Sequence, residues 1–136
     1  MLTKRQNLLE TIHGGNPDRF VNQYEYMALV ADPIFLGALG NCPKGSTSVN
    51  GWGVTIEFPA HVPGPFPNTS EELRVIKDIT KWRDYVKAPT TEYPEDAWAP
   101  FVEAAKAVDR NEQFVASMVA PGMFEKVHYL MGMEEA

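Results

Sequence analysis

The chain has 136 residues, with 12 basic against 18 acidic side chains and a formal net charge of −6. This acidic balance argues against a nucleic-acid surface, which needs a basic patch, and against binding to anionic membranes. Residues 1–15 carry charges throughout, and the longest apolar run is broken at Asp32 and Pro33; we therefore expect neither a signal peptide nor a membrane span, but a cytoplasmic protein.

The chain starts with signals for a helix, a turn and a strand. Leucine and isoleucine recur at helical spacing in residues 3–13, Thr3 is a suitable cap, and Gly14 and Gly15 follow, which predicts a helix over these residues. Asn16, Pro17 and Asp18 predict a turn, and the aromatic and β-branched residues 20–26 predict the first strand. In residues 28–39 we expect a helix on each side of Pro33.

Residues 41–67 are dense in Gly, Pro, Ser and Asn, which favours turns and an extended hairpin. Residues 54–58 alternate apolar and polar side chains, as a half-exposed strand does. Prolines at 59, 63, 65 and 67 then favour an extended backbone. Cys42 is the only cysteine, so no intrachain disulfide can form; we expect an inert loop thiol there.

The second half alternates helices with a strand. Short helices are expected from Ser70 and from Thr80, and a longer amphipathic helix over residues 95–109. A buried strand is expected over residues 113–119, and a further helix in residues 121–136. This order predicts an α/β fold with parallel pairing. An open partial sheet leaves free edges, so we expect a homo-oligomer, or else tight packing of the β-rich insert over the exposed edge.

Three segments occur in the order found in one known family: TKRQNLLETIHGGNPDRF at residues 3–20, NGWGV at 50–54 and VASMVAPGMFEKVHYLMG at 115–132. They resemble the uroporphyrinogen decarboxylase superfamily, which includes the haem-pathway decarboxylase and corrinoid-dependent methyltransferases. The resemblance implies a partial (β/α)₈ TIM barrel, its first βα units with a Pro/Gly-rich β insert, in a single domain over residues 1–136. A complete barrel needs about 250 residues, so we expect an amino-terminal portion that is inactive alone.

The resemblance also implies a substrate site on the first strand. Asn22 and Tyr26 are candidates for substrate binding there, and Glu25 and Tyr24 are candidates for catalysis, Glu25 as acid or base. The alternative is that these side chains simply alternate between core and solvent. In the decarboxylase branch of the family, arginines of this strand bind substrate carboxylates through bidentate hydrogen bonds. Residues 21–27 contain no arginine, which favours a smaller or less anionic ligand.

Two further positions are candidate ligand contacts. Trp52 is either a packing anchor or a ring on which a ligand stacks, and Asn50 stands where the family often has an acid. Pro121, Gly122 and Met123 follow the predicted buried strand. In a βα barrel that turn lies on the catalytic face, so we expect these three residues to contact substrate.

No metal site is expected in this chain, because its three histidines are far apart and form no close-spaced pair. We therefore expect no cofactor here; for the parent enzyme, the resemblance implies zinc in the later barrel and a corrinoid partner. The implied parent is a methyltransferase working with that partner, or a lyase that decarboxylates a porphyrin-type tetrapyrrole. The alternative is a non-catalytic, self-associating module derived from the same fold.

Overall fold

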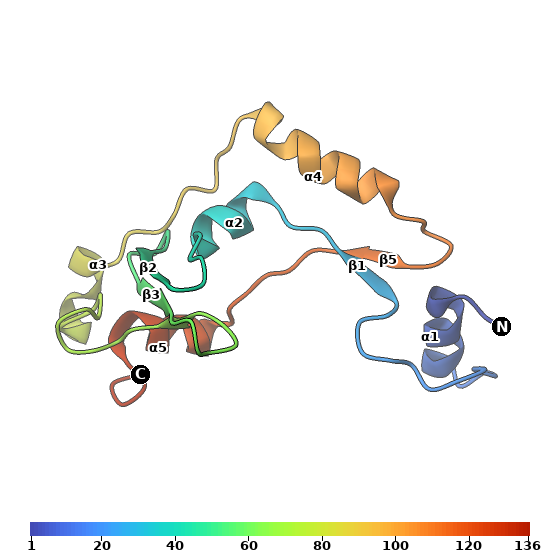
Figure 1. Ribbon diagram of the computed structural model, residues 1–136, viewed down its shortest axis with the longest axis horizontal. Coiled ribbons are helices and arrows are strands. Elements are labelled where there is room, and N and C mark those ends of the chain that lie inside the picture. The colour runs from blue at the N-terminus through green and yellow to red at the C-terminus, as the bar shows by residue number, and fades with distance from the viewer. The chain divides into compact units, whose positions relative to one another are not determined.

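The computed structural model describes residues 1–136, which form two compact units. The first unit joins Met1–Asp32 to Pro94–Met118, and the second joins Pro33–Tyr93 to Val119–Ala136. The chain is mixed α/β, and its two small sheets do not close into a barrel (Figure 1). None of the helices combines the length and apolar character needed to cross a membrane.

The first unit starts with helix α1 (Lys4–Ile12), as expected. The Thr3 hydroxyl accepts a hydrogen bond from the Gln6 amide, and the Gln6 side chain accepts one from the Thr3 amide, each at 3.1 Å. This reciprocal pair is a capping box, which satisfies amides that the first turn leaves without partners. Gly14 follows the helix with a φ of +66°, a conformation that glycine adopts without steric cost.

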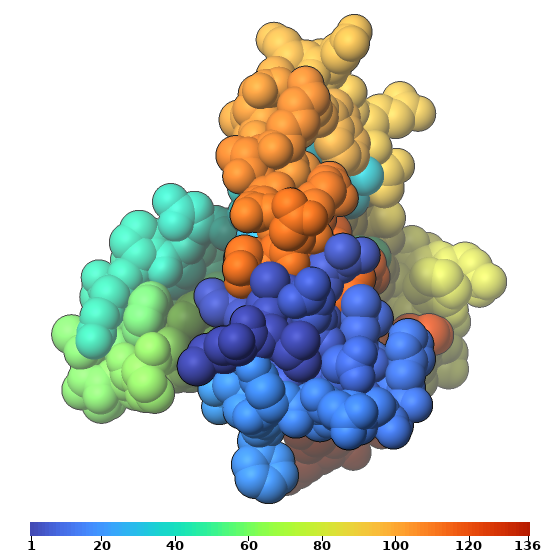
Figure 2. Space-filling model, turned by 90° about the vertical axis from the view of Figure 1, so that its right-hand side faces the viewer, coloured from blue at the N-terminus to red at the C-terminus, as the bar shows by residue number.

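Strands β1 (Met27–Leu29) and β5 (Phe114–Ala116) form a two-stranded parallel sheet. The Gln113 side chain continues the pairing by donating to the carbonyls of Glu25 (2.9 Å) and Met27 (3.2 Å). The expected parallel pairing is therefore confirmed. In Figure 2 the first helix, in dark blue, lies close to the orange segment before β5, where the Arg5 amide donates to the Glu112 carbonyl at 2.9 Å.

The strand predicted over residues 20–26 is wrong, because β1 starts only at Met27. Residues 23–26 form a turn, in which the Glu25 amide donates to the Asn22 carbonyl and the Met27 amide to the Tyr24 carbonyl. Tyr24 has a φ of +64°, which is incompatible with a strand. Local hydrogen bonding has thus overridden the β-forming composition of this segment.

Helix α4 (Glu95–Ala107) confirms the amphipathic helix predicted in the second half. Glu95 and Asp96 lie in its first turn and Lys106 lies in its last turn. Negative charges near the start of a helix and positive charges near its end both interact favourably with the helix dipole. None of its residues is fully buried. The predicted strand before residue 119 is also present as β5, although its residues are half-buried rather than buried.

The second unit is built on a three-stranded antiparallel sheet in the order β2 (Ser46–Val49), β3 (Thr55–Phe58), β4 (Phe66–Pro67). This confirms the predicted hairpin. Around it lie α2 (Pro33–Leu39), the 3₁₀ helix η1 (Ile79–Lys81), α3 (Trp82–Tyr85) and α5 (Met123–Met131). The core of this unit consists of four buried side chains: Val54, Ile76, Leu130 and Met131.

Two helix predictions in this region are wrong. Only the helix after Pro33 forms, because Ala28 and Leu29 before it belong to β1. At Ser70 the chain makes an isolated turn, in which the amides of Leu73 and Arg74 both donate to the Ser70 carbonyl. A single cap residue without a following apolar stripe does not sustain a helix.

The turn between β2 and β3 is fixed by Asn50. Its side-chain oxygen accepts hydrogen bonds from the amides of Trp52 (2.9 Å) and Val54 (3.1 Å). Helix α2 approaches this turn so closely that a Cβ on Gly51 would come within 2.4 Å of the Gly37 carbonyl oxygen. The glycine therefore permits backbone-to-backbone packing that no other residue allows.

Candidate functional site

The predicted site residues fall into two groups. Asn22, Tyr24, Glu25 and Tyr26 belong to the first unit, and Trp52, Pro121, Gly122 and Met123 belong to the second. Each group is described within its own unit.

In the first unit, the Glu25 carboxylate makes contacts with residues close to it in sequence. Its carboxylate accepts hydrogen bonds from the Asn22 amide (3.3 Å) and the Asn22 side chain (3.4 Å). It also lies 3.8 Å from the Arg19 guanidinium. Through these contacts the Glu25 carboxylate holds the turn together.

The two tyrosines of the same turn differ in exposure. Tyr24 is 57% exposed at the tip of the turn. Tyr26 is half-buried, and its carbonyl accepts the Phe114 amide at 2.8 Å, which extends the β1–β5 ladder. The segment thus places Asn22 and Glu25 together, whereas the main chain of Tyr26 serves the sheet.

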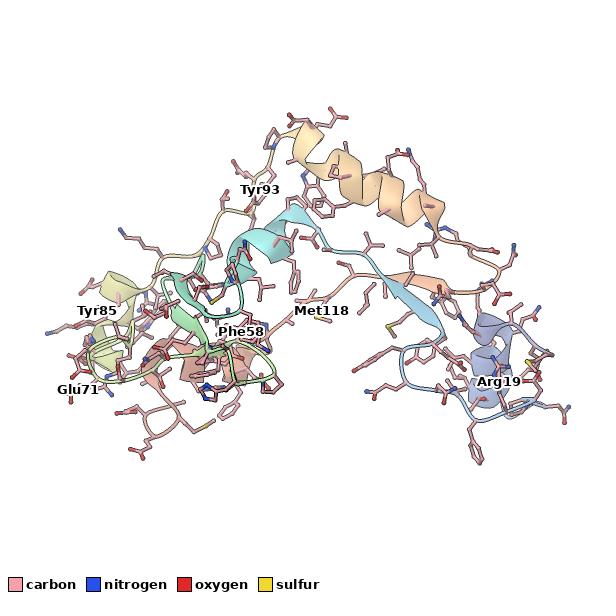
Figure 3. The ribbon with its side chains drawn as sticks, in the orientation of Figure 1. Arg19, Phe58, Glu71, Tyr85, Tyr93 and Met118 are labelled. Carbon is pink, nitrogen blue, oxygen red and sulfur yellow. The ribbon has the colours of Figure 1, made fainter.

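The segment Pro17-Asp18-Arg19 is held against α1 by Asn7, the only buried polar residue of the chain. Its amide donates to the Arg19 carbonyl and its oxygen accepts from the Asp18 amide, each at 3.0 Å. The Leu2 amide donates to the Asp18 carboxylate at 2.5 Å. This hydrogen bond, with smaller help from the neighbouring Arg19 guanidinium, lowers the pKa of Asp18. Figure 3 labels Arg19 beside the first helix.

The second unit contains a pocket of about 300 Å³. Its wall is formed by the end of α2 and the loop after it, by β3, by the Pro65–Pro67 stretch, and by α5. Most of this wall is apolar. The volume is at the lower end of the range typical of small-molecule sites.

Lys126 is the only charged residue that lines this pocket. Its ammonium group lies 4.8 Å from the centre of the Trp52 ring, a distance typical of a cation–π contact. It takes part in none of the ion pairs of the chain. Burial lowers the pKa of Lys126, since partial removal from water disfavours the charged form.

Two other polar residues of the pocket, Cys42 and Asn50, are engaged in contacts within the protein. The Cys42 thiol points to the carbonyls of Ile56 (3.4 Å) and Ser46 (3.6 Å), which is the behaviour of a structural thiol. The Asn50 side-chain oxygen is used by the hairpin turn. Lys126 therefore supplies the only charged group that a ligand would meet, beside the polar side chains of Asn41 and Tyr129.

The structure brings two of the predicted second-unit residues to this pocket. Pro121 lines it, and Trp52 contacts its lysine. Gly122 caps α5, and Met123 is 89% exposed. The sequence prediction missed Lys126 and Tyr129, although their spacing of three residues on a helix places them on one face.

No group of three or more His, Cys, Asp or Glu side chains is arranged to hold an ion.

Comparison with protein-family models, curated proteins and solved structures found no match to this chain.

Proposed function

We propose that the chain is the amino-terminal part of a uroporphyrinogen decarboxylase-like barrel enzyme. The observation that supports this best is the parallel pairing of β1 with β5. Parallel neighbours need a long crossover connection that usually contains a helix, and here α2 and α4 both lie in the connection. This order of elements agrees with the first βα units of a barrel that carry a β-rich insert.

The parent activity in this proposal is methyl transfer with a corrinoid partner, with tetrapyrrole decarboxylation as the second possibility. Binding of a tetrapyrrole with several carboxylates calls for several cations. Residues 21–27 contain no arginine, and the second-unit pocket has one lysine. Barrel sites draw residues from several strands, so we expect the 136-residue chain alone to be inactive. The proposed location is the cytoplasm.

The first test is the coding sequence downstream of Ala136. Further strands with a His-x-Cys motif and a later Cys are expected for the methyltransferase, and further strands without them for a metal-free lyase. A continuation without βα units would contradict the proposal.

The second test uses the protein encoded by the whole reading frame. Corrinoid binding is measured by equilibrium dialysis with visible absorbance, and decarboxylation of uroporphyrinogen by chromatography of the products. Corrinoid binding without decarboxylation supports the methyltransferase, and decarboxylation supports the lyase. If neither occurs, both assignments are wrong.

A non-catalytic, self-associating module is the second candidate. It is favoured by the two-stranded sheet, in which β1 and β5 each have one neighbour and so leave both outer edges without a strand. Such edges are templates for pairing with another chain. Leu29, at the end of β1, is 52% exposed.

Sedimentation velocity over a range of concentrations tests this candidate. An obligate dimer that Leu29→Lys converts to monomer supports pairing through the first-unit sheet. Leu73→Lys is the matched control, because Leu73 is also exposed but belongs to the second unit. A monomer at all concentrations contradicts self-association.

A further inference from the structure

We propose that the pocket of the second unit binds a small molecule with one carboxylate and an apolar body. This inference goes beyond the activity proposed above and does not depend on it, because every residue it uses lies in the second unit. No catalytic step is required of the chain.

The charge of the pocket is the first argument. The whole chain has a net charge of −6, yet the pocket wall contains one lysine and no aspartate or glutamate. A partly buried ammonium group without an anionic partner is unfavourable. A ligand carboxylate would supply that partner through charge-assisted hydrogen bonds.

The position of the ammonium group is the second argument. The Trp52 ring holds it on one side, 4.8 Å from the ring centre. Because a ring face accepts no conventional hydrogen bond, donors of the ammonium group remain for a ligand. Trp52 is itself positioned by the hydrogen bond from its amide to Asn50, so the hairpin turn fixes the place of the cation.

The rest of the wall determines what the carboxylate is attached to. Ala38, Leu39, Ile56, Phe66 and Pro67 contribute apolar surface. A site with one cation and a mostly apolar wall favours a ligand with one charge and an apolar chain or ring. The volume of about 300 Å³ limits that ligand to a small molecule.

Hexanoate and its neutral isostere hexanamide are the probes for this proposal. Both are titrated into the ¹⁵N-labelled 136-residue chain, and binding is followed by the indole N–H resonance of Trp52, assigned with Trp52→Phe. We expect hexanoate to bind at least ten times more tightly than hexanamide. Equal affinities, or no response to either probe, would overturn the proposal.

Variants of the lysine separate charge from packing. Lys126→Met is expected to lower hexanoate affinity at least tenfold and to leave hexanamide unchanged, while Lys126→Arg retains the preference for the anion. Lys44→Met is the matched control: Lys44 lies 5.9 Å from the Phe58 ring centre but does not line the pocket. Unchanged hexanoate binding in Lys126→Met would contradict the proposal.

A cavity-filling variant tests the place of binding. Ala38→Leu adds volume to the pocket wall without changing its charge, so both probes are expected to bind more weakly. Near-ultraviolet circular dichroism of each variant verifies that the fold is retained. Full affinity in a folded Ala38→Leu variant would place the ligand elsewhere. These results are independent of whether the parent enzyme transfers methyl groups.

Discussion

The side chain of Asn7 donates a hydrogen bond to the main-chain carbonyl of Arg19 over 3.0 Å, and so joins the first helix to the segment that leads to the first strand. Asn7 also accepts from the Asp18 amide. A buried asparagine that satisfies two backbone groups is costly to replace, because its removal leaves both without partners.

Asn7→Ala is therefore expected to lower the opening free energy of the first unit by about 1–3 kcal/mol. Amide hydrogen exchange at Asp18 and in α1 measures this loss directly. Lys4→Ala is the control, since Lys4 is exposed on the same helix. Equal exchange rates in the two variants would show that the Asn7 contacts contribute nothing.

The carboxylate of Asp18 predicts a dependence on pH. The hydrogen bond from the Leu2 amide, followed by the Arg19 guanidinium, lowers its pKa below the ordinary value of 3.8. At a pH between the pKa of Asp18 in the folded chain and its ordinary value in the unfolded chain, the unfolded chain binds more protons. The contribution of Asp18 to stability is therefore present above pH 3.8 and is lost as the pH falls through the pKa of the folded chain. In urea titrations between pH 2 and 6, the free energy of unfolding is expected to fall less steeply with acid in Asp18→Asn than in Asp84→Asn. The same slope in both variants would argue against this role.

Tyr24 is expected to be replaceable with a gain in stability. Its φ of +64° is unfavourable for a tyrosine, whereas glycine and asparagine tolerate it. Relief of about 1–2 kcal/mol, partly offset by about 0.4–1 kcal/mol of backbone entropy, predicts a net gain of about 0.8 kcal/mol for Tyr24→Gly. Thermal unfolding of Tyr24→Gly, Tyr24→Asn and Tyr24→Ala compares their stabilities, and Tyr24→Ala is expected to be the least stable of the three. A most stable Ala variant would contradict the left-handed turn.

Gly51 is expected to be intolerant of even one methyl group. A Cβ there would meet the Gly37 carbonyl oxygen at 2.4 Å and the Ala38 Cα at 3.1 Å, so the added methyl group would clash with main-chain atoms. Overpacking of this kind costs about 1–3 kcal/mol, so Gly51→Ala is expected to lower the urea midpoint of the second unit and to weaken hexanoate binding. Gly64→Ala is the matched control, because a Cβ at Gly64 meets nothing within 4 Å. Equal midpoints would mean that α2 does not pack on the hairpin turn.

The elements that the sequence predicts correctly are those with local signals. Thr3 and Gln6 cap the start of α1. The apolar side chains of α4 recur at the spacing of a helix, which predicts that element. The hairpin follows from alternating side chains between glycine-rich turns. In residues 20–26, by contrast, composition favours a strand, while the side chains of Asn22 and Glu25 bond to each other and produce a turn. Composition does not reveal such competition.

The pocket was less predictable, because its wall depends on tertiary packing. Pro121 and Trp52 were expected to contact a ligand, and they lie at the pocket or against its lysine. Lys126 belongs to no sequence motif, and its role in the proposed site comes from its partial burial and from the lack of an ion-pair partner. Neither property can be read from neighbours in sequence, because residues from α2, β3 and α5 create them together.

The parallel pairing of Met27 with Phe114 has a consequence for synthesis of the protein. The ribosome must translate the whole segment Pro33–Tyr93, which belongs to the other unit, before the partner of β1 emerges. At about 5–20 residues per second, this delay is on the order of several seconds. During that interval the three residues of β1 have no strand to pair with, so the parallel sheet of the first unit can form only late in translation.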